Sequence, residues 1–486
     1  MVYLKDLLRG IKASVPDAAY GLKINNVTSD SRMVRKRGLF IAVRGHSVDG
    51  NKFIGKAAAN GAVAVMSDRP FKAPRGVAKI TVRDIRKALP VVAGNFYRDP
   101  SKRLVTTGVT GTNGKTTITY LIENILKMSG RVPGIIGTIN YRFGDTVIPA
   151  ANTTPGPMEL QSILCRMLEA GCTDAVMEVS SHALDQRRAD NVWLDAAIFT
   201  NITGEHLDYH KTIKRYLRAK AGIFDHLKEG GTAILNNDDR RVAGLRKKTG
   251  GKTMTYGIDK RSSVSARGIR LSLNGSRFVL VTPDGSREIA TGLIGKYNIS
   301  NILAASAASI ACGIPLDAIK KGIESFSSVP GRLEPVDAGQ PFRVFVDFAH
   351  TEDALYNVLS VLKGLAPRRI ITVFGCGGNR DRNKRPGMGA VACRFSDSVV
   401  LTSDNPRFER PREIIGEIET GIRGKFSNYV VVEERRGAIR RALGMASKDD
   451  IVVIAGKGHE RYQIIRDKTM PFDDRKVARS VLLNRG

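Results

Sequence analysis

A glycine-rich segment with a lysine and two threonines is the clearest chemical signal in the sequence. It reads Gly-Val-Thr-Gly-Thr-Asn-Gly-Lys-Thr-Thr over residues 108–117. A strand-like run at 104–107 precedes it, and apolar residues at helical spacing follow over 118–130. Glycines let backbone N–H groups surround phosphate oxygens, and a helix N-terminus adds partial positive charge. The segment therefore predicts an ATP phosphate site in which Lys115 contacts the β- and γ-phosphates and Thr116 holds Mg²⁺.

Polar clusters in the last third of the chain indicate a second binding region. Each follows a short apolar run typical of a buried strand. In open parallel sheets, ligands bind beyond the carboxyl ends of the strands. The runs lie at 344–346, 370–374, 399–401 and 451–454, and the clusters at 347–353, 375–385, 404–407 and 456–460.

The elements that position these groups are predicted to form an α/β fold. Strand-like runs alternate with helix-length periodic segments, which is typical of largely parallel sheets. A chain of 486 residues favours about three domains. Turn-forming residues near 99–101 and 327–331 place the predicted boundaries, which gives domains at 1–100, 101–329 and 330–486.

Composition narrows the function classes. With 77 basic and 47 acidic residues the formal charge is +30, which suits either acidic small substrates or a polyanion. The basic residues are spread along the chain without interleaved aromatics, so we expect no specific nucleic-acid partner. No apolar run reaches the roughly 18 residues of a membrane span. Five irregularly spaced cysteines and the absence of a secretory signal favour a cytoplasmic location.

The motifs resemble those of the Mur ligases and their folylpolyglutamate synthetase relatives. Gly-Thr-Asn-Gly-Lys-Thr-Thr at 111–117 looks like their phosphate loop, and the similarity continues through 178–182 and 200–210 over essentially the whole chain. The resemblance implies amide ligation through an acyl-phosphate. It also implies a small α/β UDP-binding domain, a central P-loop ATPase domain with a parallel sheet, and a C-terminal Rossmann-like domain.

The resemblance assigns the catalytic and metal residues. It implies that Glu178 and His206 ligate Mg²⁺ together with Thr116, and that Lys220 is carbamoylated by CO₂ and ligates a second Mg²⁺. A carboxylate suits this hard cation, whereas histidine is a less usual ligand. Lys115, Glu178, His206 and Lys220 are thus the expected catalytic residues, and His182 and His350 are alternative general bases.

The resemblance also assigns the nucleotide contacts. Two positions depart from the usual pattern: Phe348 stands where the family has tyrosine, and Glu352 where it has proline. The implied ATP-binding residues are Gly111, Thr112, Asn113, Gly114, Lys115, Thr116, Thr117, Asn298, Asn301, Arg332, Asp347 and His350.

The resemblance also implies which residues contact the acceptor substrate and which contact the amino acid. The UDP-muramoyl-dipeptide contacts are Ser29, Ser31, His46, Thr153, Thr154, Ser180, Gln186 and Arg188. The diaminopimelate contacts are Arg380, Asp404, Asn405, Arg407, Gly456 and Glu460. Asp-Asn-Pro-Arg at 404–407 is the form found in the branch that adds diaminopimelate rather than lysine. A guanidinium suits the second carboxylate that distinguishes diaminopimelate from lysine.

The resemblance therefore implies a monomeric ligase that adds meso-diaminopimelate to the D-glutamyl γ-carboxylate of UDP-N-acetylmuramoyl-L-alanyl-D-glutamate in cytoplasmic cell-wall precursor synthesis. The expected cofactors are two Mg²⁺ ions and the CO₂-derived carbamate, with ATP as co-substrate. Three alternatives remain open: ligation of lysine or another diamine, a P-loop ATPase acting on nucleic acid, and a non-catalytic scaffold.

Overall fold

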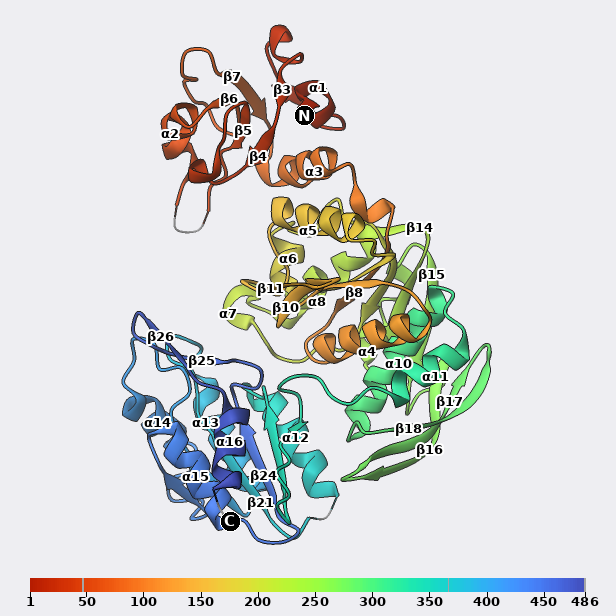
Figure 1. Ribbon diagram of the computed structural model, residues 1–486, viewed down its shortest axis with the longest axis vertical. Helices are drawn as coiled ribbons and strands as arrows, with labels where there is room; N and C mark the ends of the chain where they lie inside the picture. The colour runs from red at the N-terminus through yellow and green to blue at the C-terminus, as the bar shows by residue number, and fades with distance from the viewer. Residues whose placement is uncertain (46–47, 366, 485–486) are drawn as a thin grey trace. The chain divides into compact units, whose positions relative to one another are not determined.

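The structure is a computed structural model that describes residues 1–45, 48–365 and 367–484. The chain divides into two compact units. The first unit comprises Met1–Val264 and Ala304–Gly322, and the second comprises Ser265–Leu303 and Ile323–Gly486. Both are built from sheets flanked by helices, which confirms the predicted α/β class (Figure 1).

The N-terminal part of the first unit contains a sheet with strand order β2-β7-β6-β5-β4. All neighbours in it are parallel except β2 and β7. In β5, Leu39 and Ile41 face one apolar core, and Phe40 faces another, so both faces of the sheet are covered. The elements are β1 (Val2–Tyr3), α1 (Leu4–Leu7), β2 (Ala13–Ser14), β3 (Lys23–Ile24), β4 (Asn26–Thr28), β5 (Gly38–Ile41), α2 (Ile54–Ala59), β6 (Ala62–Ser67), β7 (Ala78–Val82) and α3 (Ile85–Tyr97).

The larger sheet of the first unit has the order β11-β10-β9-β12-β8-β13-β14-β15. The strands from β9 to β15 in this order run parallel, and β10 and β11 add an antiparallel edge. Strand β8 lies between β12 and β13, so the loops after these three strands meet at one edge. The strands are β8 (Val105–Thr110), β9 (Pro133–Ile136), β10 (Asn140–Phe143), β11 (Thr146–Pro149), β12 (Asp174–Glu178), β13 (Leu194–Phe199), β14 (Leu227–Asn236) and β15 (Lys252–Gly257).

Helices follow most of these strands, as the alternating sequence pattern predicts. Helix α4 begins at Lys115, directly after the glycine-rich segment, and its buried face includes Ile118, Leu121 and Ile125. The helices of this region are α4 (Lys115–Met128), α5 (Pro157–Glu169), α6 (Ser181–Asp185), α7 (Leu207–His210), α8 (Ile213–Ala221), α9 (Arg240–Ala243), α10 (Lys296–Ala311) and α11 (Leu316–Glu324).

The second unit contains the C-terminal sheet, with strand order β19-β20-β24-β21-β22-β23. Strands β20 to β23 in this order are parallel, as predicted. Alternate residues of β24 enter two cores: Val453 packs on one face and Val452 and Ile454 on the other. The elements are β19 (Glu334–Pro335), β20 (Arg343–Asp347), α12 (Glu352–Gly364), β21 (Ile370–Phe374), α13 (Lys384–Phe395), β22 (Ser398–Leu401), α14 (Pro411–Glu419), β23 (Tyr429–Val431), α15 (Arg435–Met445), β24 (Ile451–Ala455) and α16 (Asp474–Leu483).

Two antiparallel features of the second unit were not predicted from the sequence. The strands β16 (Val264–Ser272), β17 (Gly275–Thr282) and β18 (Gly285–Thr291) pair as a meander. A hairpin, β25 (Tyr462–Ile465) and β26 (Lys468–Pro471), follows the last parallel strand. Strands β16, β18 and β26 are largely exposed and carry short apolar runs, although β17 contains the continuous apolar run 278–281.

Candidate active site

The glycine-rich segment forms a loop between β8 and α4. Gly111 has φ +140°, and a Cβ there would lie 1.8 Å from Thr200 Oγ1, so a larger residue would not fit. The backbone N–H of Thr112 donates to Asn201 O at 2.9 Å, and that of Asn113 donates to Asn201 Oδ1 at 2.9 Å. Asn201, which sequence reasoning left without a role, therefore holds the loop from the neighbouring strand β13.

Lys115 and Lys220 meet at one carbonyl of this loop. Lys115 Nζ donates to Gly111 O at 2.9 Å and to Thr112 O at 2.8 Å. Lys220, on α8, donates from Nζ to the same Gly111 O at 2.7 Å. Lys220 is buried, and burial together with the charge of Lys115 holds its pKa well below the usual lysine value. Burial beside a second cation thus favours the neutral form of Lys220 relative to an exposed lysine.

Glu178 ends β12 as a buried carboxylate next to the first turn of α4. Its Oε2 accepts hydrogen bonds from Thr116 Oγ1 at 3.1 Å and Thr138 Oγ1 at 2.9 Å, and its Oε1 accepts from Thr138 N at 2.9 Å. Thr138 Oγ1 also lies 3.1 Å from Thr153 Oγ1. Thr138 was missed by sequence reasoning because a single threonine after β9 carries no recognisable pattern.

A group of histidines and tyrosines lies near the same edge of the sheet. The rings of His182 and His206 have centroids 4.8 Å apart. His206 adopts a left-handed backbone, with φ 55°, immediately before α7, and its side chain is 44% exposed. Burial, together with the nearby His206 and His210, lowers the pKa of His182 to about 4. His182 is therefore neutral at physiological pH.

Three of the residues assigned to the muramoyl dipeptide, Thr154, Ser180 and Arg188, lie together and share hydrogen bonds. Thr154 Oγ1 donates to Glu178 O at 2.9 Å and accepts from Ser180 N at 3.1 Å. Arg188 Nη1 donates to Thr154 O at 2.6 Å. Burial lowers the pKa of Arg188, and its Nε is buried with no hydrogen-bond partner among the described residues. Arg188 is thus a partly desolvated cation available to an anionic ligand.

The other residues assigned to this ligand lie apart from that group. Gln186 Nε2 donates to Tyr209 OH at 3.4 Å. Ser29 and Ser31 lie in the N-terminal part of the chain, where Ser29 is exposed and Ser31 is buried in a short 3₁₀ turn. His46 lies outside the described residues.

In the second unit, two of the nucleotide-assigned residues, Arg332 and His350, lie against the ring of Phe348, which follows β20. The Arg332 guanidinium lies 4.9 Å from the Phe348 ring centroid, and the rings of His350 and His459 lie 4.5 and 4.8 Å from it. The phenylalanine that replaces the usual tyrosine therefore packs against a guanidinium, which favours an electron-rich ring face. Both carboxylate oxygens of Asp347 accept backbone hydrogen bonds within the protein: Oδ2 from Leu333 N at 2.7 Å and Oδ1 from Ala349 N at 2.8 Å.

The two assigned asparagines of α10 also bond within the protein. Asn298 Nδ2 donates to Ile294 O at 2.9 Å, and Asn301 Nδ2 donates to Asn298 Oδ1 at 3.2 Å. Both residues are buried. These bonds fix the first turns of the helix.

The amino-acid residues gather beyond the carboxyl ends of β21, β22 and β24, as the polar clusters predict. We call this group, Arg380, Asp404, Asn405, Arg407, Gly456 and Glu460, the amino-acid site. Arg407 Nη1 donates to Gly378 O at 2.9 Å, and burial and the charge of Arg380 lower the pKa of Arg407. Within the described part of the chain, neither arginine forms an ion pair with a carboxylate, although the charges of Asp404 and Glu460 act on Arg407 and oppose the lowering of its pKa.

No group of three or more His, Cys, Asp or Glu side chains among the described residues is arranged to hold a metal ion. The predicted magnesium ligands include only two residues of these types, Glu178 and His206. No helix of the described chain has the length and apolar character needed to cross a membrane.

Comparisons with known proteins cover the whole length of the chain. The family model for the Mur ligase catalytic domain matches residues 23–97, the Mur ligase middle domain 109–309, and the Mur ligase glutamate ligase domain 331–458. A UDP-N-acetylmuramoyl-L-alanyl-D-glutamate–2,6-diaminopimelate ligase from Caldanaerobacter subterraneus subsp. tengcongensis is 42% identical, over 99% of this chain and 98% of that protein. The protein of the same name from Halalkalibacterium halodurans is 43% identical, over 97% of this chain and 99% of its own.

Solved structures give the same result for the fold. A structure of a UDP-N-acetylmuramoyl-L-alanyl-D-glutamate–2,6-diaminopimelate ligase is 32% identical, with a TM-score of 0.73 over 100% of this chain and 99% of that chain. A MurF ligase from Thermotoga maritima has the same fold at 20% identity, with a TM-score of 0.64 over 95% of this chain and 96% of that chain. These similarities confirm the fold implied by the sequence motifs.

Proposed function

Because this chain belongs to the Mur ligase family, we propose that it is the ATP-dependent ligase that joins meso-diaminopimelate to the D-glutamyl γ-carboxylate of UDP-N-acetylmuramoyl-L-alanyl-D-glutamate. Relatives of that name at 42% and 43% identity over nearly the full chain support this assignment. The observation that carries the choice of amino acid is the pair Arg380 and Arg407. The charge of Arg380 acts on Arg407, and neither guanidinium forms an ion pair with a carboxylate of the described chain.

The amino-acid preference follows from guanidinium groups that have no ion-pair partner within the described chain. Diaminopimelate presents two carboxylates, whereas lysine presents one. A guanidinium binds a carboxylate through two parallel hydrogen bonds, so Arg407 favours the ligand with the additional carboxylate. Lysine would leave Arg407 partly desolvated and unpaired, which disfavours it.

The reaction proceeds in two transfers. An oxygen of the γ-carboxylate attacks the γ-phosphorus of ATP, and the bond to the β,γ-bridging oxygen breaks to release ADP. The diaminopimelate amine then attacks the acyl carbon, loses a proton, and displaces inorganic phosphate from the tetrahedral intermediate. Lys115 places an ammonium at the phosphate loop, where it neutralises charge on the transferring phosphoryl group. His182, neutral and close to the loop after β13, is one candidate to take the proton, and His350 is the other.

The residues at the phosphate loop fit magnesium and a carbamate. Thr116 and Glu178 place a hydroxyl and a carboxylate 3.1 Å apart, and Mg²⁺ prefers such oxygen ligands. The lowered pKa of Lys220 favours the neutral amine, the form that reacts with CO₂. The nitrogen bonds to the CO₂ carbon and releases a proton, and the lysine becomes an oxygen ligand. We assign two ions to Thr116, Glu178, His206 and carbamoylated Lys220; bound Mg²⁺ supplies charge neutralisation for the phosphates.

The acceptor substrate is assigned to the first unit. Arg188 carries a buried Nε without a described partner, which suits a carboxylate of the D-glutamyl residue. Thr153, Thr154, Ser180 and Gln186 supply hydroxyl and amide groups for the peptide, and Ser29, Ser31 and His46 are assigned to the UDP portion.

We propose that the enzyme acts as a monomer in the cytoplasm, where ATP and UDP-linked precursors are available. The proposed domains are residues 1–100, 101–329 and 330–486. The three family matches at 23–97, 109–309 and 331–458 support this division.

The test is phosphate release from ATP with UDP-N-acetylmuramoyl-L-alanyl-D-glutamate, with meso-diaminopimelate or L-lysine as the second substrate. We expect phosphate and a tripeptide product with diaminopimelate alone. Turnover with lysine would retain the ligase but contradict the role of Arg407. No turnover with either amine, combined with salt-sensitive stimulation of ATP hydrolysis by nucleic acid, would overturn the proposal.

A further inference from the structure

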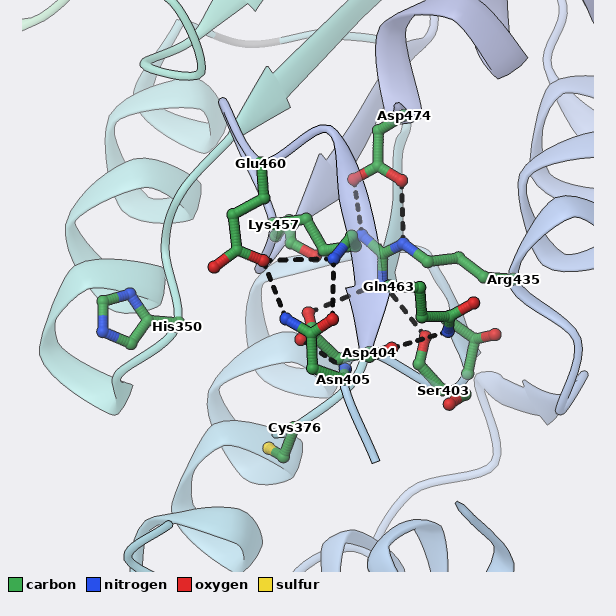
Figure 2. A network of polar contacts seen from close by, with 12 residues as sticks. His350, Cys376, Ser403, Asp404, Asn405, Arg435, Lys457, Glu460, Gln463 and Asp474 are labelled. Atoms are coloured by element: carbon green, nitrogen blue, oxygen red, sulfur yellow. Dashed lines mark hydrogen bonds and ion pairs between the residues drawn. The ribbon is translucent and has the colours of Figure 1, made fainter. Parts of the chain in front are cut away.

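A lysine that the sequence motifs left without a role is buried beneath the amino-acid site. Lys457 follows β24, between Gly456 and Gly458, and its side chain is fully buried. Its Nζ donates to Asn405 Oδ1 at 3.1 Å and lies 3.1 Å from Glu460 Oε2 (Figure 2). Both partners belong to the amino-acid site, and they come from the loops after β22 and β24. Lys457 therefore links the two loops from their buried side.

The contacts of Lys457 fix the orientation of the Asn405 amide. Asn405 Oδ1 accepts from Lys457 Nζ and also from Ile464 N at 3.0 Å. Asn405 Nδ2 donates to Glu460 Oε2 at 2.8 Å. With both lone pairs of Oδ1 engaged inside the protein, Asn405 has only the second hydrogen of Nδ2 to offer to a ligand. Within the described chain, that hydrogen has no acceptor.

The same contacts occupy one carboxylate oxygen of Glu460. Oε2 receives both Lys457 Nζ and Asn405 Nδ2, while Oε1 has no hydrogen-bond partner among the residues described. Asn405 and Glu460 consequently present one donor and one acceptor side by side. An amino acid's carboxylate and ammonium require this complementary pair of groups.

The backbone around Lys457 is held in place by neighbouring groups. Gly456 has φ +112°, and a Cβ there would lie 2.7 Å from Asp404 Oδ2, so the loops after β22 and β24 approach closely. Beneath them, Arg435 pairs with Asp474 at 2.7 Å, and both side chains are fully buried. Arg435 Nη2 also donates at 3.0 Å to the carbonyl oxygen of Ala455, the last residue of β24. This framework keeps Lys457 directed toward Asn405 and Glu460.

We propose that Lys457 is a positioning residue for the amino-acid substrate, acting through Asn405 and Glu460 without touching the ligand. Its full burial separates it from any ligand at the surface of the site, and its two contacts are both side chains assigned to that ligand. The inference rests on the proposed function, because it takes diaminopimelate as the amino acid bound there. It gives the glycine-flanked lysine a role in substrate affinity, distinct from phosphate transfer.

The test compares KM values for the three substrates in full-length Lys457→Met. The methionine keeps the side-chain length and removes the donor. We expect the KM for diaminopimelate to rise about 10-fold to 100-fold, the range for removing a hydrogen bond to buried polar groups. The KM values for ATP and for the UDP-linked substrate should remain at the wild-type level. The matched control is Lys448→Met, an exposed lysine of the same unit, which should change none of the three.

Two further variants separate positioning from general stabilisation. Lys457→Gln retains an N–H donor, so we expect it to recover part of the affinity; it also serves for the comparison if Lys457→Met does not fold. In an Asn405→Ala background, Lys457→Met should raise the KM for diaminopimelate by a smaller factor than in the wild type, because one of its two targets is gone. If the KM increases of the two single variants multiplied in full in the double variant, that result would contradict action through Asn405.

The outcomes distinguish this inference from the function on which it rests. A wild-type enzyme without turnover on diaminopimelate would overturn both. Wild-type turnover, together with an unchanged KM for diaminopimelate or an equal rise for all three substrates in Lys457→Met, would overturn the positioning role alone.

Discussion

Two buried lysines, one beside the phosphate loop and one beneath the amino-acid site, show how surroundings determine what the same side chain does. Lys220 Nζ bonds to the carbonyl oxygen of Gly111, which Lys115 also contacts, so it has a dipole and a second cation as neighbours. Lys457 Nζ bonds to the carboxylate of Glu460 and the amide oxygen of Asn405. The first environment favours a neutral amine, and the second provides a counter-charge.

The difference separates a reactive lysine from an architectural one. A neutral amine can accept CO₂, whereas a lysine paired with a carboxylate contributes direction and charge balance. The two regions also differ in construction. The phosphate loop is made of consecutive residues and backbone groups, while the amino-acid site depends on side chains brought together from separate loops.

The largest effect is expected for the buried ion pair of Arg435 and Asp474 beneath the amino-acid site. Arg435→Met leaves Asp474 buried without its partner, and we expect the free energy of unfolding to fall by about 3–5 kcal/mol. Calorimetric and urea unfolding of the full chain measure the change. Arg436→Met, an exposed neighbour on α15, is the control and should be close to neutral.

The double variant Arg435→Met/Asp474→Leu sharpens this test. Replacing both charges with apolar groups removes the unpaired carboxylate, so most of the lost stability should return. A double variant as unstable as Arg435→Met would show that the loss comes from packing and not from an isolated charge.

The next effect is on the reactive lysine. Lys220→Ala is expected to lower kcat by about 10²-fold to 10³-fold, the range for removing one group that stabilises developing charge. Phosphate release at saturating substrates measures it, and short carboxylic acids added to the buffer should restore part of the rate by replacing the carbamate. Lys214→Ala, exposed on the same helix, is the control. Normal turnover, or a complete lack of rescue, would contradict the carbamate.

A smaller effect is expected at the surface of the amino-acid site. Arg407→Ala should raise the KM for diaminopimelate by about 10-fold to 100-fold, because a charged hydrogen bond to the distal carboxylate is lost. The KM for ATP should not change. The exposed Arg410→Ala provides the control. An Arg407→Ala enzyme that uses diaminopimelate as well as the wild type does would remove Arg407 from the specificity argument.

The smallest effect concerns pH. Burial lowers the pKa of His459 from 6.5 to about 4, and the charge of Arg332 contributes. Between these values the unfolded chain binds more protons than the folded one, so this contribution to stability is complete above pH 6.5 and is lost as the pH falls toward 4. His459→Gln should therefore flatten the decrease in Tm between pH 7 and pH 4. An identical slope in the variant and the wild type would contradict the shift.

The sequence predicted most of the features that depend on consecutive residues. The parallel strands β20, β21, β22 and β24 and the helix α4 were expected, because buried strands and amphipathic helices have distinct apolar periods. The meander β16–β18 was not, since β16 and β18 are largely exposed and lack continuous apolar runs; the run 278–281 in β17 was an available strand signal. The assignments at the phosphate loop, including Lys115 and Thr116, followed from motif spacing and remain predictions about function.

By itself, the sequence determined the α/β class, the phosphate loop, and the polar loops at the ends of the C-terminal strands, because these are encoded in short windows. Only the tertiary structure decided that Lys220 and Lys115 share the carbonyl of Gly111, and that Lys457 contacts Asn405 and Glu460. Asn405 and Lys457 are 52 residues apart. Burial and partner choice depend on which chain segments pack against a side chain, and the local sequence does not specify these.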